Sequence, residues 1–176
     1  MKNFNSLLNV ILALLVVGYI GYYFYKLPKF DSGEYAKDFE GILITGEKFT
    51  LSDLKGKDVL LDFWGSWCGP CRMENPEIVS LYREFNTKNF NAGNGFEVVN
   101  IGMETNQDRW KKAIEHDGLI WKYHIGEFDK FSGPIAKLYG IKEIPTKYFI
   151  NPEGMIIKVN PTISELRTYL SDIEEK

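Results

Sequence analysis

The sequence has very few of the side chains that build metal centres and disulfide frameworks. Its 176 residues include two cysteines and two histidines. Zinc normally takes four ligands at set spacings, which His116 and His124 do not provide, and a c-type haem would need a histidine where this chain has Arg72. We therefore expect no metal site and no bound cofactor. Any redox chemistry must use Cys68 and Cys71.

The sequence also lacks a strong net charge, internal repeats and low-complexity segments. Its formal net charge is −3, so the protein as a whole has no field that would attract nucleic acid. Hydrophobic residues make up 44% and aromatic residues 15% of the chain, which excludes disorder and predicts a packed core. Without its apolar N-terminal segment the chain keeps about 150 residues, enough for one domain with a single core.

One long run has no charged residue at all. Residues 7–25 carry Asn9 as their only strongly polar side chain, and as a helix they would span roughly 28 Å, close to the thickness of a bilayer core. Four tyrosines cluster toward the end of the run, as in an interfacial aromatic belt, and Lys26 follows it. The predicted parts are a tail at 1–6, a transmembrane anchor at 7–25, a linker at 26–38 and one domain at 39–176.

Two other interpretations compete for residues 7–25. A cleaved signal peptide has a shorter apolar core and small residues before the cut, whereas this run ends in Tyr-Tyr-Phe-Tyr-Lys. A buried core helix would show a polar face. We therefore expect an uncleaved anchor. Charge does not set its orientation, because Lys2 lies on one side of the run and Lys26 and Lys29 lie on the other.

The rest of the chain alternates strand and helix patterns, which predicts an α/β fold with a mixed central sheet. A small hairpin of residues 42–44 and 48–51 comes first, and a closing helix follows from Ser164, its expected N-cap. Between them, the expected strands are 59–64, 96–103, 119–124, 147–150 and 155–159, and the expected helices are 70–86, 107–116 and 135–139.

Cys68 and Cys71 lie where a buried strand is followed by a helix, a placement that favours redox chemistry. Unpaired backbone N–H groups and the helix dipole at a helix N-terminus stabilise a thiolate. Cys71 lies one turn further, close enough to form a disulfide with Cys68, and Pro70 suits the first turn because no N–H is needed there. We expect Cys68 to attack a substrate disulfide and Cys71 to resolve the mixed disulfide.

Residues 62–71, Asp-Phe-Trp-Gly-Ser-Trp-Cys-Gly-Pro-Cys, resemble the active-site strand and loop of thioredoxin. Ile144-Pro145-Thr146 resembles the loop that faces this site in the same superfamily. The N-terminal anchor, the hairpin with residues 51–57 and the extra strand–helix region around 105–132 resemble the TlpA/ResA group of membrane-anchored members. The resemblance covers about residues 39–174 and implies a thioredoxin-like fold.

The resemblance also implies roles for residues around the cysteine pair. Asp62 matches a buried aspartate implicated in proton transfer to the resolving cysteine, Glu74 matches a glutamate near the site, and Pro145 matches a cis-proline. The residues expected to contact substrate are Trp67, Gly69, Pro70, Ile144 and Pro145. The alternatives are a structural aspartate at 62, a solvated helical charge at 74 and an ordinary trans turn at 145.

The implied activity is reduction of disulfides in envelope proteins by a bacterial, single-pass membrane protein whose domain lies outside the cytoplasm. The implied partners are a disulfide-containing protein substrate and an upstream thiol electron donor, such as a membrane protein. The Gly-Pro pair between the cysteines is that of thioredoxin, a reducing member, and favours reduction. The alternatives are a disulfide oxidase or isomerase, a copper-delivery protein with a third ligand, and a peroxidase, which normally has another cysteine spacing.

Overall fold

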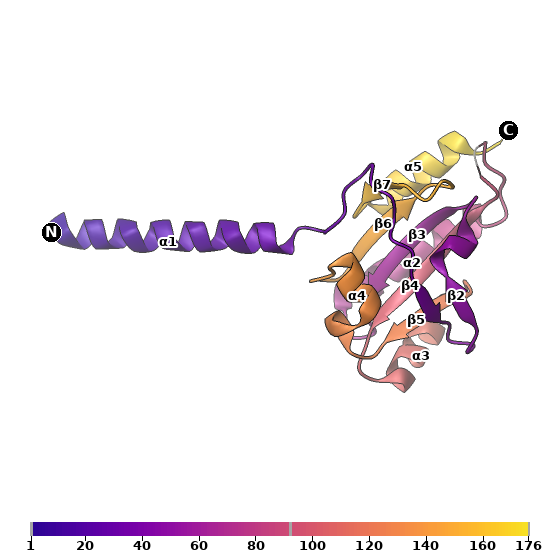
Figure 1. The fold of residues 1–176 in the computed structure, drawn as a ribbon, viewed down its shortest axis with the longest axis horizontal. Coiled ribbons are helices and arrows are strands. Elements are labelled where there is room, and N and C mark those ends of the chain that lie inside the picture. The colour runs from indigo at the N-terminus through magenta and orange to yellow at the C-terminus, as the bar shows by residue number, and fades with distance from the viewer. Residues whose placement is uncertain (1, 92, 176) are drawn as a thin grey trace.

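A computed structural model of the protein describes residues 2–91 and 93–175, with side chains from residue 6 onward. Strands and helices alternate after one long N-terminal helix (Figure 1). The strands are β1 (Glu40–Ile42), β2 (Lys48–Thr50), β3 (Asp58–Trp64), β4 (Phe96–Met103), β5 (Tyr123–Glu127), β6 (Thr146–Ile150) and β7 (Ile156–Val159). The helices are α1 (Lys2–Lys26), α2 (Gly69–Phe85), α3 (Gln107–His116), α4 (Pro134–Tyr139) and α5 (Ile163–Ile173), with short 3₁₀ turns at Leu51–Leu54 and Lys130–Ser132.

Strand β3 is the centre of a five-stranded sheet with the order β5-β4-β3-β6-β7. β4 runs parallel to β3 and β5 runs parallel to β4, whereas β6 and β7 are antiparallel to their neighbours. All seven residues of β3 are buried, because strands flank it on both sides and other elements cover both faces. The predicted α/β fold with a mixed sheet is confirmed.

The two faces of the sheet carry separate hydrophobic clusters. Apolar side chains of α2, α3 and α5 cover the face that holds Leu60 and Trp64 of β3. Helix α4 and the β1–β2 hairpin cover the other face, which holds Leu61 and Phe63. Side chains alternate along a strand, so Asp62 shares the face of Leu60 and Trp64. The carboxyl end of β3 therefore brings a buried acid and the start of α2 together.

Two strand boundaries predicted from the sequence are wrong. The hairpin begins at β1 (Glu40–Ile42), two residues before the predicted strand, because Ile42 already pairs with Lys48 at the turn. The predicted strand 119–124 is β5 at Tyr123–Glu127, which pairs with β4. Leu119 and Trp121 are buried in the loop before β5, against the α2 side of the sheet. Their apolar character reflects core packing, not strand pairing.

The predicted N-cap of the closing helix is also wrong. Thr162 takes this place, and Ser164 lies inside the first turn of α5. The Thr162 Oγ1 atom accepts a hydrogen bond from the Glu165 N–H at 3.2 Å, and the Glu165 carboxylate accepts one from the Thr162 N–H at 2.8 Å. This reciprocal capping box satisfies two N–H groups that the helix leaves unpaired, which a cap at Ser164 would not do.

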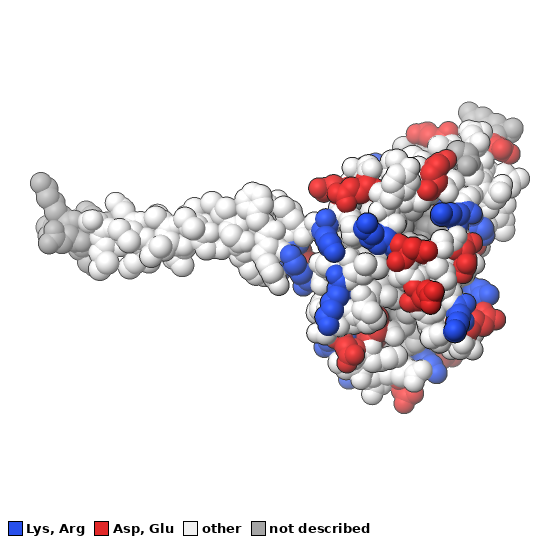
Figure 2. Space-filling view, in the orientation of Figure 1, with Lys and Arg blue, Asp and Glu red and all other residues white. Residues whose placement is uncertain are grey.

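Helix α1 leaves the domain as one continuous rod (Figure 1). Its side chains from Ser6 to Tyr25 are exposed, and Figure 2 shows this surface without acidic or basic groups. The stretch Ser6–Lys26 is long and apolar enough to cross a membrane, a property that membrane anchors share with signal sequences. Helix α1 also includes most of the predicted tail, although Met1 and the side chains of residues 2–5 lie outside the described part.

The segment after α1, predicted as a linker, is packed on the domain from Phe30 onward. Phe30 is only 5% exposed and belongs to the core cluster beneath α4. The backbone then runs beside β7, with hydrogen bonds of 2.8 Å from the Gly33 N–H to the Ile156 carbonyl and from the Ile156 N–H to the Glu34 carbonyl. Only a few residues after Lys26 thus separate the end of α1 from the folded domain.

Candidate active site

Cys68 is the N-cap of α2 and is joined to Cys71 by a disulfide. Both cysteines are nearly covered, with exposed fractions of 5% and 2%. The backbone N–H of Cys71 donates to the Cys68 Sγ atom at 3.2 Å. A backbone donor and the positive end of the helix dipole therefore both act on the Cys68 sulfur, and each stabilises negative charge there.

The loop between β3 and Cys68 is held by a buried acid that the sequence analysis did not single out. Glu104, which directly follows β4, accepts hydrogen bonds from the Ser66 N–H at 2.5 Å and the Ser66 hydroxyl at 2.9 Å. The indole Nε1 of Trp67 donates to the Met103 carbonyl at 2.6 Å. The position of Glu104 in the sequence could have identified it. An acidic residue directly after a buried parallel strand falls at the same sheet edge as the cysteines.

Trp67 directly precedes Cys68 and is 41% exposed. Its ring lies edge-on to Phe131, with centroids 6.3 Å apart, and the Lys130 ammonium lies 4.6 Å from the indole centroid. A cation over the indole face is electrostatically favourable. The first positions of α2, Gly69 and Pro70, are exposed on the other side of Cys68.

The predicted facing loop lies directly across from Cys68. The Ile144–Pro145 peptide bond is cis, as the resemblance implied. The Ile144 carbonyl oxygen lies 3.8 Å from the Cys68 Sγ atom. The loop is closed by the Thr146 hydroxyl, which donates to the Glu143 carbonyl at 2.7 Å. Residues 144–146 thus form one wall of the site and leave the Cys68 sulfur between this loop and the start of α2.

Asp62 is buried in β3, on the face that α2 covers, and is 2% exposed. Burial raises the pKa of its carboxyl to about 7, and the nearby charge of Glu74 acts in the same direction. Lys147 and the hydrogen bond from Asn100 Nδ2, at 2.6 Å, oppose that rise. The Asn100 oxygen in turn accepts from the Trp121 indole, which fixes the orientation of the amide.

Glu74 is joined to the same group through Lys147. Lys147 lies opposite Asp62 in the β3–β6 register, and its ammonium pairs with the Glu74 carboxylate. The side chain of Lys147 is 7% exposed and that of Glu74 is 23% exposed. The two acids that the sequence analysis selected therefore share one buried cation. The Asp62 carboxyl thus faces a cation whose influence on it is partly offset by the charge of Glu74.

The two histidines occupy different surroundings. His116 is exposed at the end of α3, beside the Arg72–Asp117 ion pair. His124 is buried and stacks on Trp121, and burial lowers the pKa of its imidazole to about 4. Within the part of the chain that the structure describes, no group of three or more His, Cys, Asp or Glu side chains is placed to hold a metal ion.

The fold and the cysteine site define the class of thiol–disulfide oxidoreductases with a thioredoxin-like domain. Solved structures agree with this class. The thioredoxin domain of a thiol-disulfide oxidoreductase from Bacteroides vulgatus matches with a TM-score of 0.71 and 29% identity, over 82% of this chain and 98% of that one. StoA from Bacillus subtilis matches with a TM-score of 0.59 and 27% identity, over 78% of this chain and 98% of that one.

Residues 32–159 match the model of the AhpC/TSA family, and the chain belongs to this family within the thioredoxin superfamily. The thiol-disulfide oxidoreductase ResA of Bacillus thuringiensis subsp. konkukian (strain 97-27) is 33% identical over 98% of this chain and 99% of its own length. ResA of Bacillus subtilis (strain 168) is 28% identical over 84% of this chain and 80% of its own length. The chain is a thiol–disulfide oxidoreductase of the ResA type.

Proposed function

We propose that this protein reduces disulfides in other proteins outside the cytoplasm, using Cys68 and Cys71, while α1 holds it in the cell membrane. The observation that carries the proposal is the hydrogen bond of 3.2 Å from the Cys71 N–H to the Cys68 Sγ atom at the start of α2. This arrangement stabilises Cys68 as a thiolate, the form that attacks disulfides. The Gly-Pro pair, as in thioredoxin, favours the reducing direction.

The exchange proceeds in two steps. The Cys68 thiolate attacks one sulfur of the substrate disulfide, the substrate S–S bond breaks, and the released substrate thiolate takes a proton from solvent. Cys71 then loses its proton and attacks the Cys68 sulfur, which forms the Cys68–Cys71 bond and releases the second substrate thiolate. This thiolate also takes a proton from solvent. The substrate gains two electrons and two protons, and an external dithiol donor must return the enzyme to its reduced form.

Asp62 is the proposed acceptor for the Cys71 proton. Its carboxyl is buried on the face of β3 that packs against the hydrophobic cluster containing Cys71. Its pKa of about 7 lets it exchange protons near neutral pH. Glu74 acts electrostatically, because its negative charge raises the pKa of Asp62 and offsets the opposite effect of its ion-pair partner Lys147. In this proposal Asp62 transfers the proton and Glu74 adjusts the pH at which the transfer occurs.

Substrate binds at the rim around the disulfide in this proposal. The rim consists of Trp67, Gly69, Pro70, Ile144 and Pro145. The exposed face of Trp67 offers apolar contact area, and the facing loop offers backbone groups to an extended substrate segment. An upstream thiol donor uses the same rim, because the reduction of Cys68–Cys71 passes through a mixed disulfide at the same sulfur.

The placement outside the cytoplasm rests on α1 and on the ResA relatives. An uncleaved α1 would keep the domain at the membrane surface, since its apolar stretch ends at Lys26. Fusion of a reporter to the C-terminus tests this. A reporter that is active only outside the cytoplasm, attached to a protein of full length in the membrane fraction, is the expected result, and a cytoplasmic signal contradicts it.

The direct test of the activity compares three proteins with a dithiol donor and a disulfide-containing protein substrate. The unaltered protein reduces the substrate, Cys68→Ser falls to the uncatalysed rate, and Cys71→Ser accumulates a mixed disulfide through Cys68. If Cys68→Ser retains the unaltered rate, the proposal is wrong. The redox potential separates reduction from oxidation: a value near the −270 mV or so of thioredoxin supports a reductase, and one near the −120 mV or so of DsbA supports an oxidase.

A further inference from the structure

The end of α1 is attached to the same loop that forms one wall of the disulfide site. The Lys26 ammonium pairs with the Glu143 carboxylate at 2.6 Å, and the Lys142 ammonium donates to the Tyr25 carbonyl. The Lys142 ammonium also lies 4.1 Å from the centroid of the Tyr25 ring. Glu143 directly precedes Ile144, whose carbonyl oxygen lies 3.8 Å from the Cys68 sulfur. A short path of contacts therefore leads from the end of α1 to the reactive atom.

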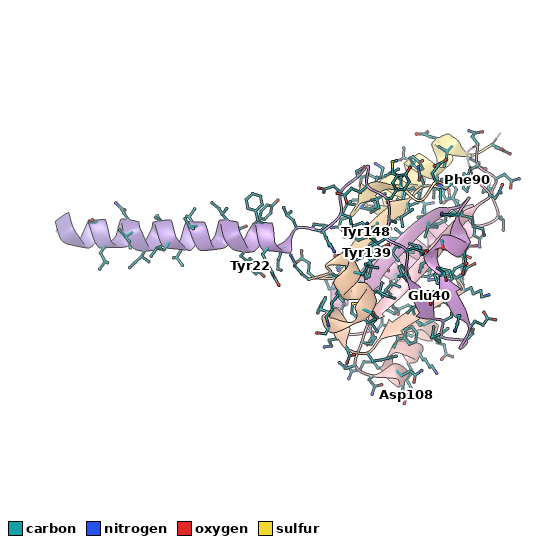
Figure 3. All side chains as sticks on the ribbon, viewed as in Figure 1. Tyr22, Glu40, Phe90, Asp108, Tyr139 and Tyr148 are labelled. Carbon is teal, nitrogen blue, oxygen red and sulfur yellow. A yellow bond between two sulfur atoms is a disulfide. The ribbon has the colours of Figure 1, made fainter. Side chains whose placement is uncertain are left out.

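A second set of contacts fixes the segment between α1 and the domain. The Lys29 ammonium donates to the Leu138 carbonyl at the end of α4, at 2.9 Å. Phe30 packs edge-on against Tyr139 and Tyr148, at centroid distances of 5.4 and 6.4 Å. Figure 3 shows these two tyrosines on the side of the domain that α1 approaches. Three residues separate Lys26 from the buried Phe30, so the four Cα–Cα steps between them span at most about 14 Å.

These contacts define the direction in which the site faces. If α1 spans the bilayer, Tyr22 and Tyr25 mark the membrane surface, because tyrosines prefer the interface between lipid and water. Residues 142 and 143 lie at that surface through their contacts with Tyr25 and Lys26. The C-terminus and the end of α5 lie on the opposite side of the domain (Figure 1). Figure 2 shows basic groups where the domain meets the end of α1.

We infer that the domain is held in one orientation, with the Cys68–Cys71 site turned toward the membrane surface. The substrate class that fits this orientation is a disulfide or dithiol carried on a protein that is itself bound to the membrane, with its sulfur atoms close to the bilayer. Freely diffusing proteins reach the site less easily, because the bilayer lies beside it. This inference rests on the proposed function for its substrate class, whereas the orientation itself rests on the contacts above.

The first experiment measures orientation without any activity. Cys68 is labelled with a fluorophore in a Cys71→Ser variant of the full chain in phosphatidylcholine vesicles that contain lipids with nitroxide headgroups. The reference is a label at Ser171→Cys in a Cys68→Ser, Cys71→Ser background, which leaves no other cysteine. Ser171 is exposed near the end of α5. Strong quenching at Cys68 and weak quenching at position 171 are expected. Equal quenching at both positions overturns the inference.

The second experiment measures the preference for bound substrates. A peptide disulfide is attached to the vesicle through an acyl chain and a short spacer, and the same peptide is also supplied free in solution, with dithiothreitol as donor. A flexible insertion of 20 glycine and serine residues between Leu27 and Pro28 lets the domain turn away. We expect this insertion to slow reduction of the bound peptide by about fivefold, through a lower effective concentration. Reduction of the free peptide should be no slower than before, because the bilayer no longer lies beside the site.

The matched control places the same insertion after Gly46, in the exposed turn between β1 and β2, and should leave both rates unchanged. The double variant Lys142→Ala, Glu143→Ala should also reduce the preference, since it removes both contacts with the end of α1. If the Leu27–Pro28 insertion leaves the preference intact, the inferred orientation is wrong. If the unaltered protein reduces neither peptide, the proposed function fails, and the quenching experiment still decides the orientation.

Discussion

Strand β3 carries two buried aspartates with the same raised pKa and very different surroundings. Asp58 begins the strand and Asp62 follows four residues later on the same face. Burial raises the pKa of both carboxyls to about 7. Asp62 accepts a hydrogen bond from Asn100 and faces Lys147 across the β3–β6 pair. Among the described residues, neither carboxylate oxygen of Asp58 has a hydrogen-bond partner.

The comparison shows that a raised pKa does not by itself identify a functional acid. Burial shifts both carboxyls, since removing water disfavours the charged form wherever it occurs. Only Asp62 lies at the carboxyl end of β3, where α2 begins with the cysteine pair and where Lys147 and Glu74 complete a charged group. The surroundings of the two acids, not their pKa values alone, should therefore separate their effects on activity and stability.

The largest expected effect is on the rate of disulfide reduction. Asp62→Asn removes the proposed proton acceptor and should lower the rate by about a hundredfold, the low end for general acid–base catalysis. Asp58→Asn should leave the rate within about twofold. Asp58 lies at the other end of β3 and shares no hydrogen-bond partner with the site, so its replacement should not alter the site. Initial rates with a saturating dithiol donor at pH 7 provide the measurement. Equal losses in the two variants would show that proximity to the cysteines is irrelevant.

The next effect is on stability and concerns Glu104, a buried acid with partners. Glu104→Ala leaves the Ser66 N–H and hydroxyl without their acceptor, so the free energy of unfolding should fall by about 1–3 kcal/mol. Urea unfolding of the full chain in detergent micelles measures this change. Ser66→Ala in the otherwise unaltered chain is the control. It removes only one of the two donors, so the free energy of unfolding should fall by less. An unchanged unfolding midpoint for Glu104→Ala would contradict the role of this acid.

Asp58→Asn should raise the stability of the protein, whereas Glu104→Ala lowers it. In the native state the pKa of Asp58 lies above its ordinary value, so the native protein binds a proton more tightly than the unfolded chain does. Ionising Asp58 therefore costs stability progressively between about pH 4 and pH 7, and the full cost remains above pH 7. Asp58→Asn should raise the free energy of unfolding by about 1–2 kcal/mol at pH 8 and have little effect at pH 4. A gain of the same size at both pH values would contradict this explanation.

The smallest expected effect is a shift in the pH dependence of reduction. Removing the negative charge of Glu74 with Glu74→Gln should lower the pKa of Asp62, whereas removing the positive charge of Lys147 with Lys147→Gln should raise it. The midpoint of the pH–rate curve should therefore move to lower pH in the first variant and to higher pH in the second. Single-turnover rates from pH 5 to pH 9 measure both midpoints. Shifts in the same direction would exclude Asp62 as the titrating group.

Local patterns in the sequence were sufficient for the parts of the site that lie next to one another in the chain. The apolar run at 59–64 followed by Cys68-Gly69-Pro70-Cys71 predicts a buried strand, a helix start and a reactive sulfur, because each depends on neighbouring residues. The place of Asp62 in a fully buried strand was also visible in this way. The boundaries of β5 and α5 were missed, because strand pairing and the competition between Thr162 and Ser164 as caps depend on contacts beyond the local pattern.

The sequence by itself determined the fold class, the cysteine pair and the apolar N-terminal helix, because periodicity, spacing and run length are properties of the chain. Only the tertiary structure decided that Lys147 stands opposite Asp62, that Glu104 holds Ser66, and that Lys26 and Lys142 attach the end of α1 to the loop beside Cys68. These pairs lie between 38 and 117 residues apart in the chain. Long-range packing brings them together, and no local pattern encodes which distant partners will meet.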